Sequence, residues 1–532
     1  MRATERGSSP TIHDWLSNLR LCLVVGLLCA ACGGLGSLRS HGNDGGQGGN
    51  GGMAGGASIG GSGDTSPTGV AGLATGAGGA MHTGGATAGA LATLTVSFAG
   101  KGAGTVLLQP GDTVCTAPTT CTASFASGTP VTLTAKPSNA GATVSSILSG
   151  WDGACAGNGP YRLCTLTMNA ATSTAARFES LPANLVFVTS SVLAGNLGGA
   201  AAYQRQCNQL ATAAGINNTA GDAYVAWMAA TDYAPATLLG SSRGWVRADL
   251  LPWIDSMATA LATGAVYYPV AYDENGQRVI GDTLSGMSDT HALYAGENCK
   301  DWTDATVNAS HGHTHAGGRG WPSNNVGVSS CAIASRVICV MKGTSTLVAV
   351  TPVTGKKIYL TKSAWFPGGG LAAADAKCLL DAPASVTSAK AILVASTRTL
   401  ADVLGATTVY VRPDGVRVGT GAEIIQAMND NTGPASIEAA VTQDGGGSYV
   451  SPWIEITGRP GYVCPMVVWT GLTYPIRGNG DTCLEWTSSS STDYATSGCI
   501  AAGWSYAGTC SSDPCNNDWQ GTACDYLQCA EQ

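Results

Sequence analysis

The sequence predicts an α+β protein that is rich in β-strands and divided into several domains. With 532 residues the chain is too long for one hydrophobic core. Only 11% of the residues are charged, and the many small and β-branched residues are typical of an exported β-rich protein. The third observation is an eight-residue phrase that occurs twice, as Gly-Glu-Asn-Cys-Lys-Asp-Trp-Thr at 296–303 and as Gly-Asp-Thr-Cys-Leu-Glu-Trp-Thr at 480–487.

The chain begins with features of an export signal. Three arginines precede an apolar run at 21–31, which is too short to span a bilayer. The run ends in Cys-Ala-Ala-Cys-Gly at 29–33, which resembles a bacterial lipoprotein signal. The resemblance implies a signal peptide at 1–32, acylation of Cys32 and an anchor in the outer membrane or at the cell surface. Secretion without a lipid is the alternative.

Residues 33–90 are dominated by glycine, with almost no large apolar side chains. Such a composition cannot offset the entropy of ordering, so we expect a flexible tether. The formal net charge of the whole chain is -8, and no cluster of Lys and Arg occurs. Nucleic acid is therefore excluded as a partner, and contact with a membrane is expected only through the N-terminal lipid.

Residues 91–180 predict a small β domain. Residues 94–98 and 131–135 alternate apolar and polar side chains, as half-buried strands do. Gly-Trp-Asp-Gly-Ala-Cys at 150–155 and the strand-like segments around it resemble a divergent internalin-type B-repeat domain. The resemblance implies a stalk or spacer of β-grasp-like shape. We expect two local disulfides here, Cys115 with Cys121 and Cys155 with Cys164.

The remaining sequence consists of two divergent copies of one module, copy 1 at 184–343 and copy 2 at 356–532. A Gly-Gly pair precedes Cys207 and Cys378 at the same interval, and Trp-Val-Arg-Ala-Asp at 245–249 corresponds to Tyr-Val-Arg-Pro-Asp at 410–414. Each copy predicts a first strand, a short Ala-rich helix and then short strands, which include 266–270 and 437–441. Asp249 and Asp414 are expected to close tight turns.

Nineteen cysteines indicate an oxidising compartment. After three in the leader, they fall into even groups of four, four and eight, so each domain can close its own disulfides. Free thiols or zinc sites are the alternative, but the paired C-x-x-C spacing of structural zinc sites is missing.

Copy 1 resembles an uncharacterised bacterial lipoprotein domain family with a C-type-lectin-like fold related to that of endostatin. The matching residues include 186–190, 195–199, 246–249 and 298–303. The resemblance implies two tandem C-type-lectin-like domains, with disulfides Cys207–Cys339, Cys299–Cys331, Cys378–Cys529 and Cys483–Cys524. It leaves Cys464, Cys499, Cys510 and Cys515 to pair among themselves, in an order that the sequence does not specify.

Three groups of residues are candidates for chemistry. His311, His313 and His315 alternate in a Gly-rich loop and are candidate zinc or copper ligands, although copy 2 has no matching histidines. Asp-Glu-Asn at 273–275 and Asn-Asn-Asp at 516–518 are candidate calcium ligands or turns, but the triplets that bind calcium and sugar in lectins are missing. No cofactor is certain.

An enzyme is not expected. Gly-x-Ser-x-Gly at 240–244 formally matches a nucleophile elbow, but a strand is expected after Ser242 where the elbow needs a helix, and His291 is the only candidate base.

We therefore expect a surface lipoprotein that displays lectin-like modules for adhesion or recognition of a glycan, matrix or envelope polymer. A structural envelope protein without a soluble ligand is the alternative, followed by a metal-dependent enzyme. Trp321, Trp504 and Trp519 are the candidate ligand contacts, with a core position as the alternative for each. Trp302 and Trp486, in the repeated phrase, are expected in the core.

Overall fold

The computed structural model describes residues 90–532 except 289–290, 319–320, 322–327, 430–435, 451–452, 456–462, 466, 473–481, 491, 500–508 and 515–524. The expected signal peptide and all of the expected tether except residue 90 lie outside these residues. The described part is rich in strands that form several sheets, with few helices, which agrees with the predicted α+β class. None of its helices is long and apolar enough to cross a membrane.

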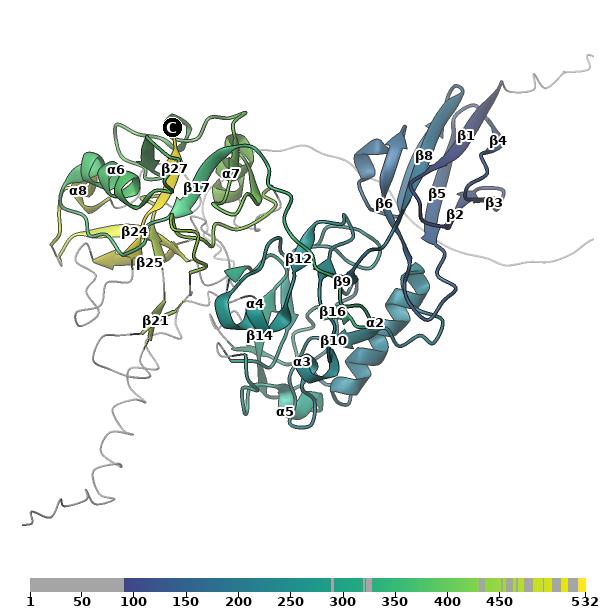
Figure 1. The fold of residues 1–532 in the computed structure, drawn as a ribbon, viewed down its shortest axis with the longest axis horizontal. Helices are drawn as coiled ribbons and strands as arrows, with labels where there is room; N and C mark the ends of the chain where they lie inside the picture. Colours follow the sequence, from purple (N-terminus) through teal and green to yellow (C-terminus); the bar gives the residue numbers. More distant parts are fainter. Residues whose placement is uncertain are drawn as a thin grey trace, which may run out of the picture. The chain divides into compact units, whose positions relative to one another are not determined.

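Residues 91–180 form two four-stranded sheets (Figure 1). The first contains, in order, β4 (Cys121–Ala126), β1 (Leu91–Ala99), β8 (Thr172–Ser180) and β6 (Ser146–Gly153). The second contains β3 (Thr113–Thr116), β2 (Gly104–Gln109), β5 (Thr129–Pro137) and β7 (Leu163–Met168), and a 3-10 turn, η2 (Ala156–Asn158), follows β6. Alternate residues of β1 and β5 are buried in one core that both sheets share. The predicted strands 94–98 and 131–135 lie inside β1 and β5.

Copy 1 is built around a five-stranded sheet whose order is β10 (Tyr224–Ala226), β16 (Ile338–Met341), β9 (Asn184–Val188), β11 (Trp245–Val246) and β12 (Pro252–Ile254). β9 is buried along its whole length. The helix α2 (Ala200–Ala214) packs on one face of the sheet, and a cluster of tryptophans packs on the other. Because β9 is covered on both faces, its sequence is the continuous apolar run Leu-Val-Phe-Val at 185–188 instead of an alternating pattern.

Copy 1 also contains three short helices and a second sheet. The helices are α3 (Pro235–Leu238), α4 (Met257–Thr263) and α5 (Cys299–Trp302). The second sheet has the order β13 (Asp282–Leu284), β14 (Asn308–His313) and β15 (Val328–Ser330).

Copy 2 has a five-stranded sheet with the same pattern. Its order is β18 (Ala389–Ala391), β27 (Gln528–Glu531), β17 (Lys356–Leu360), β19 (Val409–Val411) and β20 (Arg417–Thr420). In each sheet the third and fourth strands pair in parallel and the other neighbours are antiparallel. The helix α6 (Gly370–Asp381) packs on one face, as α2 does in copy 1.

The remaining elements of copy 2 are short. They are η4 (Leu400–Asp402), α7 (Gly421–Asn429), α8 (Cys483–Trp486), the pair β21 (Trp453–Glu455) and β22 (Val463–Pro465), and the sheet β25 (Thr509–Pro514), β24 (Tyr494–Cys499), β23 (Val467–Trp469) and β26 (Asp525–Tyr526).

Two predicted strands, 266–270 and 437–441, are wrong, because both segments have irregular backbone. In each of them a carbonyl accepts a hydrogen bond from a buried arginine instead of from a neighbouring strand. Arg247 Nη1 donates to Pro269 O at 3.0 Å, and Arg412 Nη1 donates to Ala440 O at 3.4 Å.

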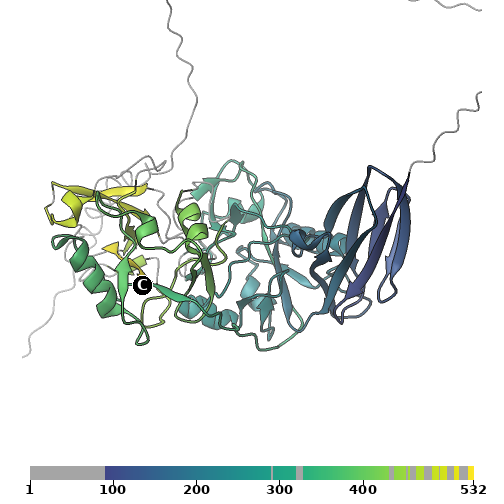
Figure 2. The same ribbon diagram turned by 90° about the horizontal axis from the view of Figure 1, so that it is seen from above.

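Residues 91–180, coloured purple to blue in Figure 2, share a hydrophobic core and a hydrogen bond with copy 1. Val144 and Ile147 belong to the same hydrophobic core as α2. The Asn139 side chain donates to the carbonyl of Gly215, which ends α2, at 2.7 Å. A cavity of about 20 Å³ remains at this contact, which is room for about one water molecule. The β segment is therefore packed against copy 1.

Candidate functional site

Five disulfides frame the described residues, and each joins cysteines that we expected to pair. They are Cys115–Cys121, Cys155–Cys164, Cys207–Cys339, Cys299–Cys331 and Cys378–Cys529. Cys483 is also disulfide-bonded, and Cys524, its expected partner, lies outside the described residues. The side chains of Cys464, Cys499, Cys510 and Cys515 lie outside them too.

The repeated phrase folds into a left-handed turn in both copies. Residues Cys299–Trp302 have φ values of 54°, 47°, 55° and 66°, and Cys483–Trp486 have 50°, 51°, 58° and 66°. Side chains other than glycine avoid this region, at a cost of roughly 1–2 kcal/mol per residue. A backbone that adopts it four times in succession must be held by its surroundings.

An acidic side chain holds the turn in each copy. The Asp301 carboxylate accepts hydrogen bonds from Thr231 N and Thr231 Oγ1, both at 2.8 Å. In copy 2, Glu485 Oε2 accepts from Ser396 N at 2.8 Å and from Ser396 Oγ at 3.1 Å. The hydrogen bonds from Thr231 lower the pKa of Asp301. This explains why the phrase keeps an acidic residue at this position.

The tryptophan of the phrase is fully buried in both copies, as expected. Trp302 Nε1 donates to Ala229 O and Trp486 Nε1 donates to Val394 O, each at 2.9 Å. A Cβ atom added to Gly286 would lie 2.8 Å from the Trp302 ring. The phrase is therefore a structural element, in which the disulfide, the turn and the indole fix one another.

The three candidate zinc ligands do not form a site. The described residues contain no group of three His, Cys, Asp or Glu side chains placed to share a metal ion. The His313 and His315 rings are 6.0 Å apart, and His315 Nε2 lies 3.4 Å from the Arg278 guanidinium, a neighbour that repels cations. Burial lowers the pKa of His311, and it lowers that of His313 to about 4. Burial also lowers the pKa of His315 well below its ordinary value, with Arg278 contributing.

Trp321, the first candidate ligand contact, is a core residue, so that prediction is wrong. Its side chain is 1% exposed. It stacks on Trp227 with ring centroids 5.2 Å apart and meets Trp253 edge-to-face at 4.9 Å. Its position in a late loop gave no information on burial, and an indole gains most from being enclosed. Trp504 and Trp519 lie outside the described residues.

The candidate calcium ligands of copy 1 form a turn. Asp273 Oδ1 accepts from the backbone of Asn275 and Gln277 at 2.9 and 2.8 Å, and Glu274 is bonded to Ser190 N at 2.9 Å. Asp444 Oδ1 makes the same turn in copy 2. Burial raises the pKa of Asp273. The second candidate segment, 516–518, lies outside the described residues.

Ser242 lies in the connection between a helix, α3, and a strand, β11. This order is the reverse of the one that a nucleophile elbow requires. Ser242 Oγ accepts a hydrogen bond from Gly343 N at 3.0 Å.

The Arg-Asp pairs form the expected tight turns and are also buried. Arg247 Nη2 lies 2.5 Å from Asp249 Oδ2, and Arg412 Nη2 lies 2.7 Å from Asp414 Oδ2. The arginine side chains are 3% and 1% exposed. Burial opposes ionisation of Asp414, but the charge and hydrogen bond of Arg412, together with hydrogen bonds from Val416 and Tyr449, outweigh it and lower the pKa of Asp414. A buried guanidinium needs a hydrogen-bond acceptor for each of its N–H groups.

A groove of about 680 Å³ lies along α2. Its polar lining includes Gln204, Arg205, Gln209 and Asp222. Arg205 and Gln209 are exposed, and neither side chain has a hydrogen-bond partner within the described part. Gln204 Oε1 accepts from Tyr233 Oη at 2.7 Å, which leaves its amide nitrogen available.

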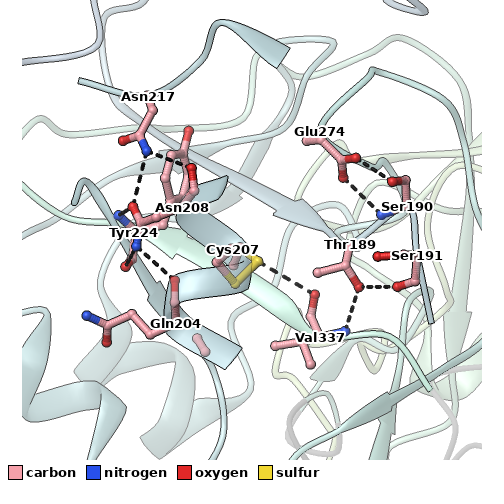
Figure 3. The surroundings of a disulfide bond; sticks show 12 residues. Thr189, Ser190, Ser191, Gln204, Cys207, Asn208, Asn217, Tyr224, Glu274 and Val337 are labelled. Carbon is pink, nitrogen blue, oxygen red and sulfur yellow. Dashed lines mark hydrogen bonds between the residues drawn. A yellow bond between two sulfur atoms is a disulfide. The ribbon is translucent and has the colours of Figure 1, made fainter. Parts of the chain in front are cut away.

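The helix that carries this groove is fixed on its inner side. The Asn208 side chain donates to Tyr224 O at 2.8 Å and accepts from Tyr224 N at 3.0 Å, and Asn217 donates to Asn208 O at 2.9 Å (Figure 3). The Cys207–Cys339 disulfide ties the residue before Asn208 to β16. The groove therefore lies on a rigid support, as a preformed binding surface requires.

Copy 2 lacks the polar lining. At the same distances before and after the helix cysteine, α6 has Asp375, Ala376 and Leu380 in place of Gln204, Arg205 and Gln209. Asp375 is occupied by a bidentate pair with Arg398, at 2.8 and 2.6 Å, and Leu380 is 77% exposed. Our sequence analysis did not single out these residues. The signal was available, since the polar residues at 205 and 209 share the helix face opposite the buried positions 203, 207 and 211, and Gln204 borders the buried face.

No known protein family matches the sequence, and no curated protein is significantly similar to it.

Proposed function

We propose that the chain is an exported, lipid-anchored surface protein whose modules recognise an extracellular polysaccharide. Three features support this: the leader that ends at Cys32, the disulfides that frame both copies, and the groove on α2. The groove is the observation that carries the proposal. The segment 91–180 would then act as a β spacer of the stalk type.

The arrangement of the disulfides supports a C-type-lectin-like fold for the two copies. In copy 1 a long-range bond joins the first helix to the last strand, and the shorter Cys299–Cys331 bond ties the late loops. The Cys378–Cys529 bond of copy 2 repeats the long-range connection. One main helix, short strands and cysteines at both ends are what the resemblance of copy 1 implies.

The chemistry of the groove favours an acidic polysaccharide. The free guanidinium of Arg205 suits a sugar carboxylate, which it can bind through two parallel hydrogen bonds. The amides of Gln204 and Gln209 and the carboxylate of Asp222 suit sugar hydroxyls, because each is a planar group with donors or acceptors at its edge. We therefore propose a polymer that contains uronic acid, bound without calcium by copy 1.

Binding of the full chain to polygalacturonate tests this proposal, with dextran as the neutral control and with chelator in a parallel series. We expect binding to polygalacturonate that survives chelation and falls at least tenfold in Arg205→Gln, since one charge-assisted pair contributes about 1.5–3 kcal/mol. Lys377→Gln on α6 removes one positive charge from the equivalent helix of copy 2 and is the matched control.

Other outcomes point to the competing functions. An equal loss of polygalacturonate binding in Arg205→Gln and Lys377→Gln would show that binding depends on the overall charge and not on the groove. A complete absence of binding would favour a structural protein of the envelope. Loss on chelation would implicate an ion, and depolymerisation of the polysaccharide would show an enzyme.

A further inference from the structure

We propose that the two copies bind each other through equivalent surfaces, as an internal pseudo-twofold pair, and that this surface is sufficient to hold them together without a covalent link. The partner that this surface fits is thus a second copy of the same module. The proposal rests on contacts among described residues and is independent of any ligand.

An apolar cluster between the copies has the same positions on both sides. Its buried members are Tyr268 of copy 1 with Val416 and Ala439 of copy 2, and Leu251 packs against them. Leu251 and Val416 each lie four residues after the buried arginine. Tyr268 and Ala439 each lie five residues before the aspartate that forms the Asx turn. When each side supplies the same positions to one contact, the interface is isologous.

The polar contacts across the junction use equivalent acceptors, although the two arginines that donate to them are not at equivalent positions. Arg412 Nη2 of copy 2 donates to Val266 O of copy 1 at 3.2 Å. In the other direction, the Arg278 guanidinium of copy 1 donates to Ile437 O of copy 2. Val266 and Ile437 are equivalent, because each lies seven residues before the Asx-turn aspartate. The same carbonyl of each copy therefore accepts from an arginine of the other copy.

A third polar contact adds to this pair. The backbone N–H of Arg417 donates to Tyr268 Oη at 3.2 Å, which satisfies the hydroxyl of an almost fully buried tyrosine. Buried polar groups that lose such partners are costly, so separating the copies is opposed by more than the apolar contact.

A single exposed segment of the chain connects the two copies covalently. Residues 351–354 are exposed, and each of the five disulfides that the structure assigns lies within one copy or within 91–180. Cutting the chain here should thus leave only the proposed surface to hold the copies.

To test this, a protease recognition sequence is inserted between Thr351 and Pro352 of the full chain. The protein is purified in detergent and cut without reductant. The products are then analysed by size-exclusion chromatography at micromolar concentration. We expect the two fragments to elute together. Separation of fragments that keep their circular dichroism would overturn the proposal.

Point variants then identify the surface. Arg278→Gln and Arg412→Gln should each cause the cut fragments to separate. Arg398→Gln is the matched control, because it breaks an Arg-Asp pair of copy 2 away from the junction and should leave the fragments together. Arg278→Gln keeps the test decisive if Arg412→Gln unfolds copy 2. Fragments that remain together in Arg278→Gln and in every folded junction variant would show that another surface holds them.

Discussion

Four consecutive left-handed residues are an uncommon conformation for side chains other than glycine, and the chain adopts it twice. At Lys300 the side chain is exposed, so nothing in the core depends on its Cβ atom. The buried disulfide and the buried indole at the two ends of the turn offset the free energy that this conformation costs. It follows that the strain can be relieved at this position without loss of the fold.

We predict that Lys300→Gly raises the free energy of unfolding by roughly 0.5–1 kcal/mol, because glycine accepts positive φ freely while adding some entropy to the unfolded chain. Thermal unfolding of the full chain measures the effect. Lys300→Ala is the control, since it also loses the ion pair with Asp304 but keeps the Cβ atom. A glycine variant that is less stable than the alanine variant would contradict the argument.

The buried histidines predict a dependence of stability on pH. Burial lowers the pKa of His313 to about 4, whereas the unfolded chain titrates near 6.5. As the pH falls below about 6.5 the unfolded state therefore binds more protons, and stability is lost until about pH 4, by about 1.4 kcal/mol per unit of pKa difference.

We accordingly expect the midpoint of thermal unfolding to fall between pH 7 and pH 5, and to fall less in His313→Gln. His82→Gln, in the predicted tether, should leave the pH dependence unchanged. Equal slopes in the wild type and His313→Gln would mean that His313 is not the titrating group.

Single residues also show where sequence reasoning stops. The tryptophans of the repeated phrase were placed correctly in the core, because a cysteine beside them implied a disulfide to pack on. Trp321 was misplaced, since its burial depends on Trp227 and Trp253, which are distant in the sequence. The burial of Arg247 and Arg412 was missed for the same reason, although their turns were predicted from the aspartate two residues later.

Among the elements, the disulfides differ most in the length of chain that they close. Cys207–Cys339 spans 132 residues and Cys115–Cys121 spans 6, and all four cysteines except Cys121 are buried. Loop-closure entropy predicts a loss of about 5 kcal/mol for the first bond and about 2 kcal/mol for the second when both cysteines become alanine.

Calorimetry on the two double variants tests this difference. We expect Cys207→Ala with Cys339→Ala to lower the main transition clearly more than Cys115→Ala with Cys121→Ala. The reverse order would show that native packing, and not loop closure, dominates the contribution of these bonds.

Strand prediction succeeded where alternation was regular and failed where an arginine intervened. Segments 94–98 and 131–135 alternate because one face of each sheet is buried and the other is not. Segments 266–270 and 437–441 are equally apolar, but their carbonyls accept hydrogen bonds from Arg247 and Arg412, and both segments lie at the junction between the copies. No local pattern reveals such an interaction, because the arginine is some twenty to thirty residues earlier in the chain.

At the level of the whole molecule, the proposed arrangement is a lipid, a tether, a β spacer and two modules. We predict that the wild-type chain fractionates with membranes and that Cys32→Ser releases it to the soluble fraction. Mass spectrometry of the N-terminal peptide provides the direct measurement, with an acylated Cys32 as the expected species. An unmodified N-terminus beginning elsewhere would support plain secretion.

The first and last strands of each copy are hydrogen-bonded neighbours. β9 and β16 are antiparallel partners that pair Val186 with Val340, and β17 and β27 pair Ile358 with Ala530. The two ends of a copy therefore lie about one strand spacing apart, close to 5 Å. A segment whose ends meet in this way can be spliced into a surface loop of another protein, or doubled in tandem, without stretching its host. Gene duplication could thus lengthen this chain by whole modules while leaving each fold intact.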